Sequence, residues 1–247
     1  MSESSFYCQV LYIQTLSYNK STVYFTPDRI SAAKDIAIEF IAQRPSDRMG
    51  IVVFAGESYT QCPLTTDRAT LINLMKEIST DLIEDGTAIG NGLATAVARI
   101  KDSDAKSRVV ILLTDGVNNS GEVAPETAAE IAKTYGIRVY TIGVGANGEA
   151  PYPVMTPWGV QVQNMKVEID EKLLTSIAQT TGGRYFRATD NTKLSEIYSE
   201  INKMEKARVS VDSFPVYKEL FGGYALAALI CLLLELLIKL LVLRRLP

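Results

Sequence analysis

Histidine is absent from the 247 residues of this chain. Its absence removes the side chain that most often acts as a general base near neutral pH, and with it every histidine-based catalytic triad. The sequence also lacks a Gly-x-Ser-x-Gly nucleophile turn and a Gly-x-x-x-x-Gly-Lys phosphate-binding loop. We therefore predict that the chain is not an enzyme and has no small-molecule substrate.

The chain also has few cysteines and a small net charge. The three cysteines, Cys8, Cys62 and Cys231, are an odd number without regular spacing, so no disulfide framework is expected. A net charge of −3 without a basic stripe argues against nucleic-acid binding. A hydrophobic content of 47% is enough for one sizeable α/β domain and an apolar anchor.

Hydrophobic periodicity predicts alternating strands and helices. The unbroken apolar run 109–113, in a predicted strand 109–114, is typical of a central parallel strand that is buried on both faces. We expect further strands at 50–54, 58–61, 138–144 and 184–187, and helices at 28–43, 68–79, 89–101, 125–135, 171–180 and 191–207. Residues 7–15 are rich in β-branched and aromatic side chains and are the candidate first strand. This alternation predicts an α/β fold with a doubly wound, mainly parallel sheet flanked by helices.

Two oxygen-bearing residues stand at positions where chemistry is expected. Asp115 follows the strand 109–114, and ligands bind beyond the carboxyl ends of parallel strands. Thr87 lies on a Gly-rich loop that opens the next predicted helix. A carboxylate and a hydroxyl are ligands suited to Mg²⁺. The alternatives are structural: Asp115 as a turn residue and Thr87 as a helix cap.

Several long, ordered segments resemble the von Willebrand factor type A domain, and within it the bacterial Bat aerotolerance proteins of the BatA type. The resemblance begins near Thr26 and covers about nine-tenths of the chain. The segments that carry it are 27–34, 47–56, 61–67, 85–93, 112–119, 137–145, 181–189 and 243–247.

The resemblance implies a metal-ion-dependent adhesion site with an Asp-x-Ser-x-Ser run, a Thr and a later Asp. Carried over by position, these last two are Thr87 and Asp115, and Ser17 falls on the first Ser of the run. Thr15 stands where the run has Asp, and Lys20 adds a nearby positive charge. We therefore expect Mg²⁺ or Mn²⁺ binding to be weak or lost, because one of two anionic ligands is missing.

The first 25 residues are unlike the family, whose members begin with two membrane helices. We expect an altered start, by truncation, frameshift or a wrong start codon, with residues 7–15 as a substitute first strand. The domain resembling the family then spans 26–207, and 208–219 is an extended linker.

The C-terminal end contains the one long apolar run, from Phe221 to Leu243. Its length predicts a transmembrane helix at 220–243, and Arg244 and Arg245 place the tail 244–247 in the cytoplasm by the positive-inside rule. We therefore expect a bacterial inner-membrane protein with one C-terminal span and its domain in the periplasm.

Three residues are candidates for partner binding. Glu235 lies inside the apolar run, where it marks a contact with another membrane subunit or pairs with Lys239 one turn later. Tyr152 and Trp158 lie in a predicted long loop, 146–163, where they form an apolar patch for a partner or fold back onto the domain.

Two functions follow from these features. The resemblance implies a membrane-anchored interaction module that works beside other Bat-type membrane proteins in an envelope complex linked to oxidative-stress tolerance. The alternative is a metal-dependent hydrolase or phosphoryl-transfer enzyme on a similar α/β scaffold, with Asp115 at its centre.

Overall fold

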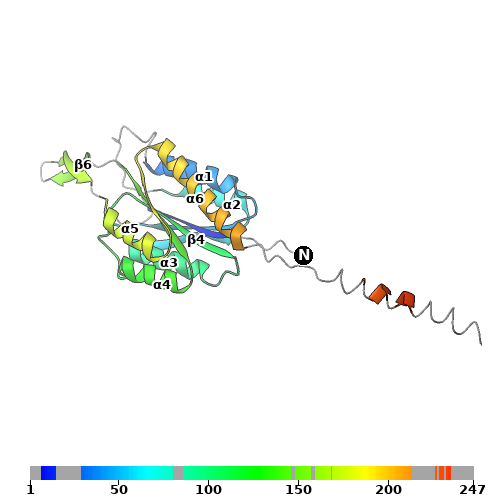
Figure 1. Cartoon of the computed structure of the whole chain (residues 1–247). Coiled ribbons are helices and arrows are strands. Elements are labelled where there is room, and N and C mark those ends of the chain that lie inside the picture. Colours follow the sequence, from blue (N-terminus) through cyan, green and yellow to red (C-terminus); the bar gives the residue numbers. More distant parts are fainter. Residues whose placement is uncertain are drawn as a thin grey trace, which may run out of the picture. The chain divides into compact units, whose positions relative to one another are not determined.

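The protein is described by a computed structural model (Figure 1). The residues that it describes are 7–14, 29–79, 86–145, 148–156, 159–167, 169–212, 226, 228–230 and 232–234. The chain divides into two units, Met1–Val209 and Ser210–Pro247.

A six-stranded sheet forms the centre of the first unit. Its strands, in spatial order, are β3 (Ser58–Thr65), β2 (Arg48–Phe54), β1 (Tyr7–Gln14), β4 (Ser107–Thr114), β5 (Arg138–Val144) and β8 (Tyr185–Ala188). Only the edge strand β3 is antiparallel to its neighbour; the other four pairings are parallel. The predicted mainly parallel sheet is therefore confirmed.

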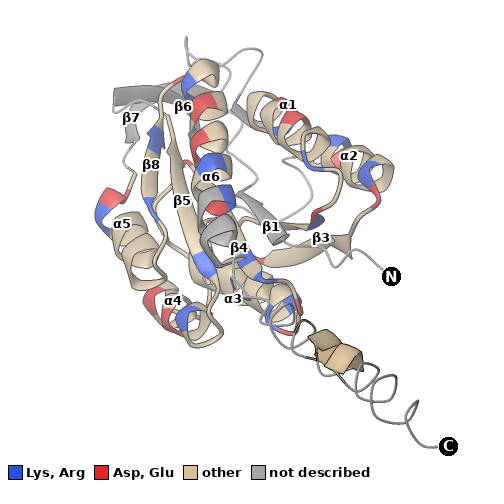
Figure 2. Ribbon diagram, turned by 45° about the vertical axis from the view of Figure 1, so that its right-hand side comes forward, with Lys and Arg blue, Asp and Glu red and all other residues tan. Residues whose placement is uncertain are grey.

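Helices cover both faces of this sheet, as the doubly wound arrangement requires (Figure 1). One face packs against α1 (Arg29–Ala42), α2 (Arg68–Glu77) and α6 (Asn191–Asp212). The other packs against α3 (Ile89–Ile100), α4 (Pro125–Thr134) and α5 (Glu171–Thr180). Figure 2 shows charged positions along the helices, while the middle of β4 and β5 carries none.

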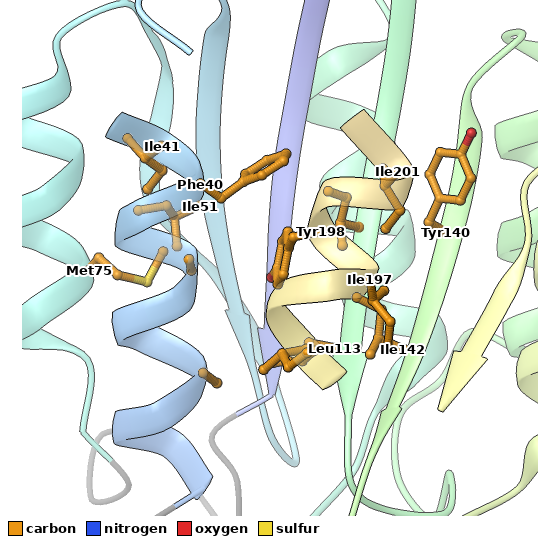
Figure 3. Close-up of a cluster of buried hydrophobic side chains, with 14 of the residues drawn as sticks. Phe40, Ile41, Ile51, Met75, Leu113, Tyr140, Ile142, Ile197, Tyr198 and Ile201 are labelled. Carbon is orange, nitrogen blue, oxygen red and sulfur yellow. The ribbon is translucent and has the colours of Figure 1, made fainter. Parts of the chain in front are cut away.

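Strand β4 shows why the apolar run 109–113 has no polar interruption. Val109, Ile111 and Leu113 belong to the core under α1, α2 and α6, and Val110 and Leu112 belong to the core under α3, α4 and α5. Figure 3 shows Leu113 in the first of these cores beside side chains from α6 and β5. A strand covered on both faces needs apolar side chains at every position, and each such burial contributes about 1.5–3 kcal/mol.

Most predicted elements lie within a few residues of the observed ones, with two exceptions. Helix α6 continues to Asp212, five residues into the predicted linker that starts at Arg208. The predicted loop 146–163 is wrong: the segment contains the strands β6 (Gly148–Thr156) and β7 (Gly159–Val167), which pair with each other as a separate two-stranded sheet. The prolines of this segment indicated a loop, but a two-strand ribbon tolerates proline at outward-facing positions.

The predicted transmembrane segment 220–243 lies mostly outside the described residues. Within the part of the chain that the structure describes, no helix is both long and apolar enough to cross a membrane.

A buried carboxylate fixes α6 to the amino ends of two central strands. Glu205 of α6 is fully buried and accepts hydrogen bonds from Tyr140 Oη (2.6 Å), Ser107 Oγ (2.7 Å) and Arg138 Nε (3.0 Å). Its second oxygen also lies 2.5 Å from Arg138 Nη2, which completes an ion pair. These four donor atoms, from three residues, satisfy a charge that would otherwise be very costly to bury.

The same contacts set the protonation of this group. Burial alone would raise the pKa of Glu205, but the hydrogen bonds from Arg138, Tyr140 and Ser107, with the charge of Arg138, together hold that pKa below its ordinary value. Because the folded-state pKa is lowered, the stabilisation is present above the ordinary pKa of 4.5 and is lost as the pH falls through the folded-state value.

We predict that Glu205→Ala lowers the free energy of unfolding at pH 7 by about 3 kcal/mol, because it leaves the Arg138 charge and the Tyr140 hydroxyl without their partner. Urea denaturation of residues 1–212 measures this. The difference from the parent protein should shrink as the pH falls below 4.5 and through the lowered folded-state pKa of Glu205, because the carboxylate then becomes protonated.

The matched control is Glu200→Ala on the same helix. Glu200 pairs with Arg184 at 2.7 Å, but both side chains are exposed, so its removal should cost less than about 1 kcal/mol. Equal losses from the two substitutions would contradict the assigned role of Glu205.

Candidate functional site

The strand order places a crevice-forming position between β1 and β4. In this sheet, β2 and β3 follow β1 in the chain and lie on one side of it, and β5 and β8 follow β4 and lie on the opposite side of the sheet. In sheets of this kind the loops on either side of such a switch point separate at the carboxyl ends of the strands, where ligands bind. The predicted ligands Asp115 and Ser17 follow β4 and β1 respectively. Ser17 lies outside the described residues.

Asp115 is held at the first position beyond β4. It is 7% exposed, and the preceding Thr114 is fully buried. The hydroxyl of Thr114 accepts a hydrogen bond from the backbone N–H of Gly116 at 3.3 Å, which turns the chain directly after the strand. The carboxylate therefore sits at a nearly buried strand end, where water screens its charge poorly.

Thr87 lies on the loop before α3, and two asparagines hold this loop in place. The backbone N–H of Thr87 donates to Asn119 Oδ1 at 2.8 Å, and that of Ile89 donates to Asn118 Oδ1 at 2.8 Å. In return, the carbonyl of Thr87 accepts from the N–H of Asn119 at 3.1 Å. The start of α3 is thus capped by side chains from the loop that follows Asp115.

The structure therefore revises the capping role considered for Thr87. Ala88 is the N-cap residue of α3 and makes no side-chain capping hydrogen bond. The asparagines take this role from a distant part of the sequence. The sequence pattern does not reveal this role, because the bonded partners of Asn119 and Asn118 lie 32 and 29 positions away in the chain.

A third loop closes against the same place. The N–H of Ala88 donates to the carbonyl of Ala55, just after β2, at 2.7 Å. The loops meet so closely that a Cβ on Gly90 would lie 1.8 Å from the carbonyl oxygen of Val123. Gly86 adopts a φ of +148°, and its Cβ would lie 2.8 Å from the Cα of Gly56. Glycine is required at both positions, and the loops are held tightly together as a result.

The oxygen atoms of Asp115 and Thr87 are of the type that binds a hard cation such as Mg²⁺. Asp115 supplies a carboxylate and Thr87 a hydroxyl, and Mg²⁺ accepts such oxygen ligands while it keeps several waters. Across the described ranges, however, no group of three or more His, Cys, Asp or Glu side chains gathers to hold a metal. The residues therefore fit a cation bound by few protein ligands and not a multi-carboxylate centre.

A depression of about 510 Å³ lies beside this edge of the sheet. Asn118 lines it together with Pro125 and Glu126 at the start of α4 and with Lys172 and Ser176 of α5. The asparagine that caps α3 thus also borders this depression.

The three predicted partner-binding residues are not brought to this site by any described contact. Tyr152 belongs to β6, in the separate two-stranded sheet, and its side chain is not described. Trp158 and Glu235 lie outside the described residues. Their roles stay predictions.

Comparison with known proteins gives three concordant findings. A sequence model of the von Willebrand factor type A domain matches residues 17–200. The crystal structure of the conserved hypothetical protein BatB from Bacteroides thetaiotaomicron matches with a TM-score of 0.67 and 29% identity, over 81% of this chain and 98% of that chain. An aerotolerance-related membrane protein from Bacteroides fragilis matches with a TM-score of 0.65 and 27% identity, over 80% of this chain and 98% of that chain.

Curated relatives are longer than this chain. An uncharacterized protein of Borreliella burgdorferi is 28% identical over 216 residues, which cover 85% of this chain and 63% of the relative. A UPF0353 protein of Mycolicibacterium gilvum is 26% identical over 212 residues, which cover 78% of this chain and 59% of the relative. The matched region thus spans about six-tenths of the length of these relatives.

Proposed function

The chain belongs to the von Willebrand factor type A domain family, and from this membership we propose that it is a membrane-anchored, Bat-type protein-interaction module. The single observation that carries the proposal is the pair of asparagine hydrogen bonds, which hold the loop of Thr87 against the loop that follows Asp115. These bonds support the proposal because they hold together the two loops that carry the proposed oxygen ligands, Thr87 and Asp115.

We propose that Asp115, Thr87 and Ser17 hold Mg²⁺ or Mn²⁺ together with water. When bound, the cation would supply a positive charge and an open coordination position for a carboxylate of the partner protein. The residues of this chain orient the ligands and limit the access of water, since Asp115 and Thr87 are only 7% and 6% exposed. The depression beside Asn118 offers the partner a neighbouring contact surface.

The charge balance at this site predicts weak binding. Thr15 stands where the family's run has a carboxylate, so Asp115 is the one anionic ligand of the proposed set. Lys20 adds a positive charge to the same segment. Because the number of charged ligands strongly sets the affinity for a divalent cation, we expect an affinity between micromolar and low millimolar.

Isothermal titration calorimetry of residues 1–212 with Mg²⁺ and with Mn²⁺ tests this site. We predict measurable binding to the parent protein and its loss in Asp115→Ala, because that substitution removes the one carboxylate. Asp104→Ala is the matched control, since the Asp104 side chain is 98% exposed, and it should bind as the parent does. An unchanged affinity in Asp115→Ala would refute the site.

The exposed apolar residues near the C-terminus support the membrane anchor. All seven described residues of the segment 220–243 are exposed in the second unit, and all are apolar: Leu226, Ala228, Leu229, Ile230, Leu232, Leu233 and Leu234. A continuous apolar surface of this kind is unfavourable in water and marks a site of membrane or protein contact. The similar protein from Bacteroides fragilis is an aerotolerance-related membrane protein, which supports the same proposal.

We further propose that residues 220–243 span a bacterial inner membrane and that the domain lies on the periplasmic side. Arg244 and Arg245 support this direction through the positive-inside rule. Other Bat-type membrane proteins are the proposed partners, with Glu235 as the contact inside the membrane. The proposed process is oxidative-stress tolerance, for which the aerotolerance-related relative is the support.

Charge placed in the segment 220–243 tests the anchor. We predict that the double substitution Leu229→Arg and Leu233→Arg shifts the full chain from the membrane to the soluble fraction after carbonate washing, because each Arg at mid-membrane costs about 2.5–3.5 kcal/mol or more. The control is Leu229→Ile with Leu233→Ile, which keeps the segment apolar. If the parent chain is itself released by carbonate, the anchor does not exist.

A further inference from the structure

Among the described residues, the strands of the β6–β7 hairpin pair only with each other and with no strand of the six-stranded sheet. Its register runs without a shift from the pair Gly148–Val167 to the pair Thr156–Gly159. Two strands alone are at best marginally stable in water, and a third strand or a packed face is usually needed. The hairpin therefore has the form of an element that is completed by pairing with something else.

The turn determines which backbone groups face outward. Two residues separate Thr156 from Gly159, and in such a turn the flanking residues form a hydrogen-bonded pair. Hydrogen-bonded and non-hydrogen-bonded pairs alternate along an antiparallel ladder. Every second residue of β6 counted back from Thr156 therefore points its N–H toward β7, and the residues between them point theirs outward.

This alternation places both prolines of β6 at the outer edge. Pro151 and Pro153 fall on outward positions, where the missing N–H breaks no bond to β7. The two prolines independently indicate the same inward and outward positions as the turn does. A residue at an inward position must donate its N–H to β7, and proline has no N–H to donate. The two prolines leave the outer edge of β6 without two of its donors, which is one of the ways in which proteins prevent strands from adding to an edge.

The outer edge of β7 has no such protection. The residues paired with the outward positions of β6 are Val160, Val162, Asn164 and Lys166, and each has an N–H to donate. Between Glu149 and Lys166 the sequence contains no charged residue. A long edge strand without proline, whose one charged residue lies near its end, is a template for the addition of another strand.

We propose that this open edge pairs with β7 of a second copy of the chain. Antiparallel pairing of the two β7 strands would give a four-stranded sheet in which a proline-blocked β6 forms each outer edge. Such an interface is two-fold symmetric and closed, so assembly stops at a dimer and does not continue into a fibre.

Charge and symmetry favour a second copy as the occupant. Lys166 lies near one end of β7, so antiparallel pairing sets the two lysines at opposite ends of the interface. The central residues that meet are valine, glutamine and asparagine, with β-branched valines at two of the four outward positions. A second β7 is already paired on its other side with its own β6, whose outer edge carries the two prolines. This explains why one edge of the hairpin is protected by proline and the other is not.

The base of the hairpin is fixed to the domain, as an assembly element needs. Arg187 of β8 donates from Nε to the carbonyl of Gly145 at 2.8 Å, just before β6. The same guanidinium pairs with the carboxylate of Glu171, shortly after β7. One side chain therefore ties down the chain on both sides of the hairpin.

Two proline substitutions at equivalent outward positions test the pairing. Val162→Pro removes an outward donor from the open edge of β7, and Met155→Pro removes one from the already blocked edge of β6. Neither touches a bond within the hairpin. Sedimentation equilibrium of the full chain in a mild detergent measures the assembly state at roughly 10–100 μM, since small interfaces associate weakly.

We expect a dimer for the parent and for Met155→Pro, and at least a tenfold weaker dimer for Val162→Pro. Thermal unfolding of each variant verifies that the domain remains folded. A monomeric parent, a dimer unaffected by Val162→Pro, or equal weakening by both prolines would each overturn the proposal. The inference does not depend on the metal site, so loss of metal binding in Asp115→Ala leaves it unaffected.

Discussion

The covering of the sheet on both faces is the constraint on which the rest of this structure depends. Because helices pack against each face, the central strands must be apolar along nearly their whole length. Functional polar side chains are then confined to the ends of the strands. At the carboxyl end, the two asparagines that follow Asp115 bind the loop of Thr87. At the amino end, Glu205 gathers Arg138, Ser107 and Tyr140 around one buried charge.

The two polar clusters serve different purposes. The one around Glu205 is satisfied by its own neighbours, so it fixes α6 to β4 and β5 and leaves no anionic oxygen for a ligand. At the carboxyl end, the side-chain oxygens of the asparagines accept hydrogen bonds from backbone N–H groups of the loop before α3. These bonds hold the two loops together, and the carboxylate of Asp115 and the hydroxyl of Thr87 on these loops are the proposed ligands. Rigid positioning by a surrounding shell is what a binding site with few ligands needs.

Much of the fold was predictable because a buried parallel strand and an amphipathic helix each leave a clear periodicity. The run 109–114 identified the central strand, and the polar turn after it indicated Asp115 as the candidate ligand. The hairpin was not predictable in the same way. Pro151 and Pro153 indicate a loop, because only the strand pairing shows that their missing N–H groups face away from β7. The turn between β6 and β7 also lacks the Asn-Gly pair that usually indicates a hairpin.

The contacts that hold the site were also beyond reach from the sequence. Asn119 bonds to a residue 32 positions earlier, and Glu205 bonds to Ser107 across 98 positions. The residues next to Asn118 and Asn119 indicate only a turn, and those next to Glu205 indicate only an exposed helix face. The hydrogen-bond partners of these residues lie too far away in the sequence to influence such a local pattern. Only the strand order brings these groups together.

The central claim is that the switch point between β1 and β4 binds a divalent cation through Asp115. The most direct measurement is a crystal structure of residues 1–212 grown with Mn²⁺, using anomalous scattering to locate the ion. The account predicts one peak at coordination distance from the Asp115 carboxylate, with an oxygen of Thr87 or a water between them completing its shell. A map without a peak there, or with the ion bound only elsewhere on the surface, would contradict it.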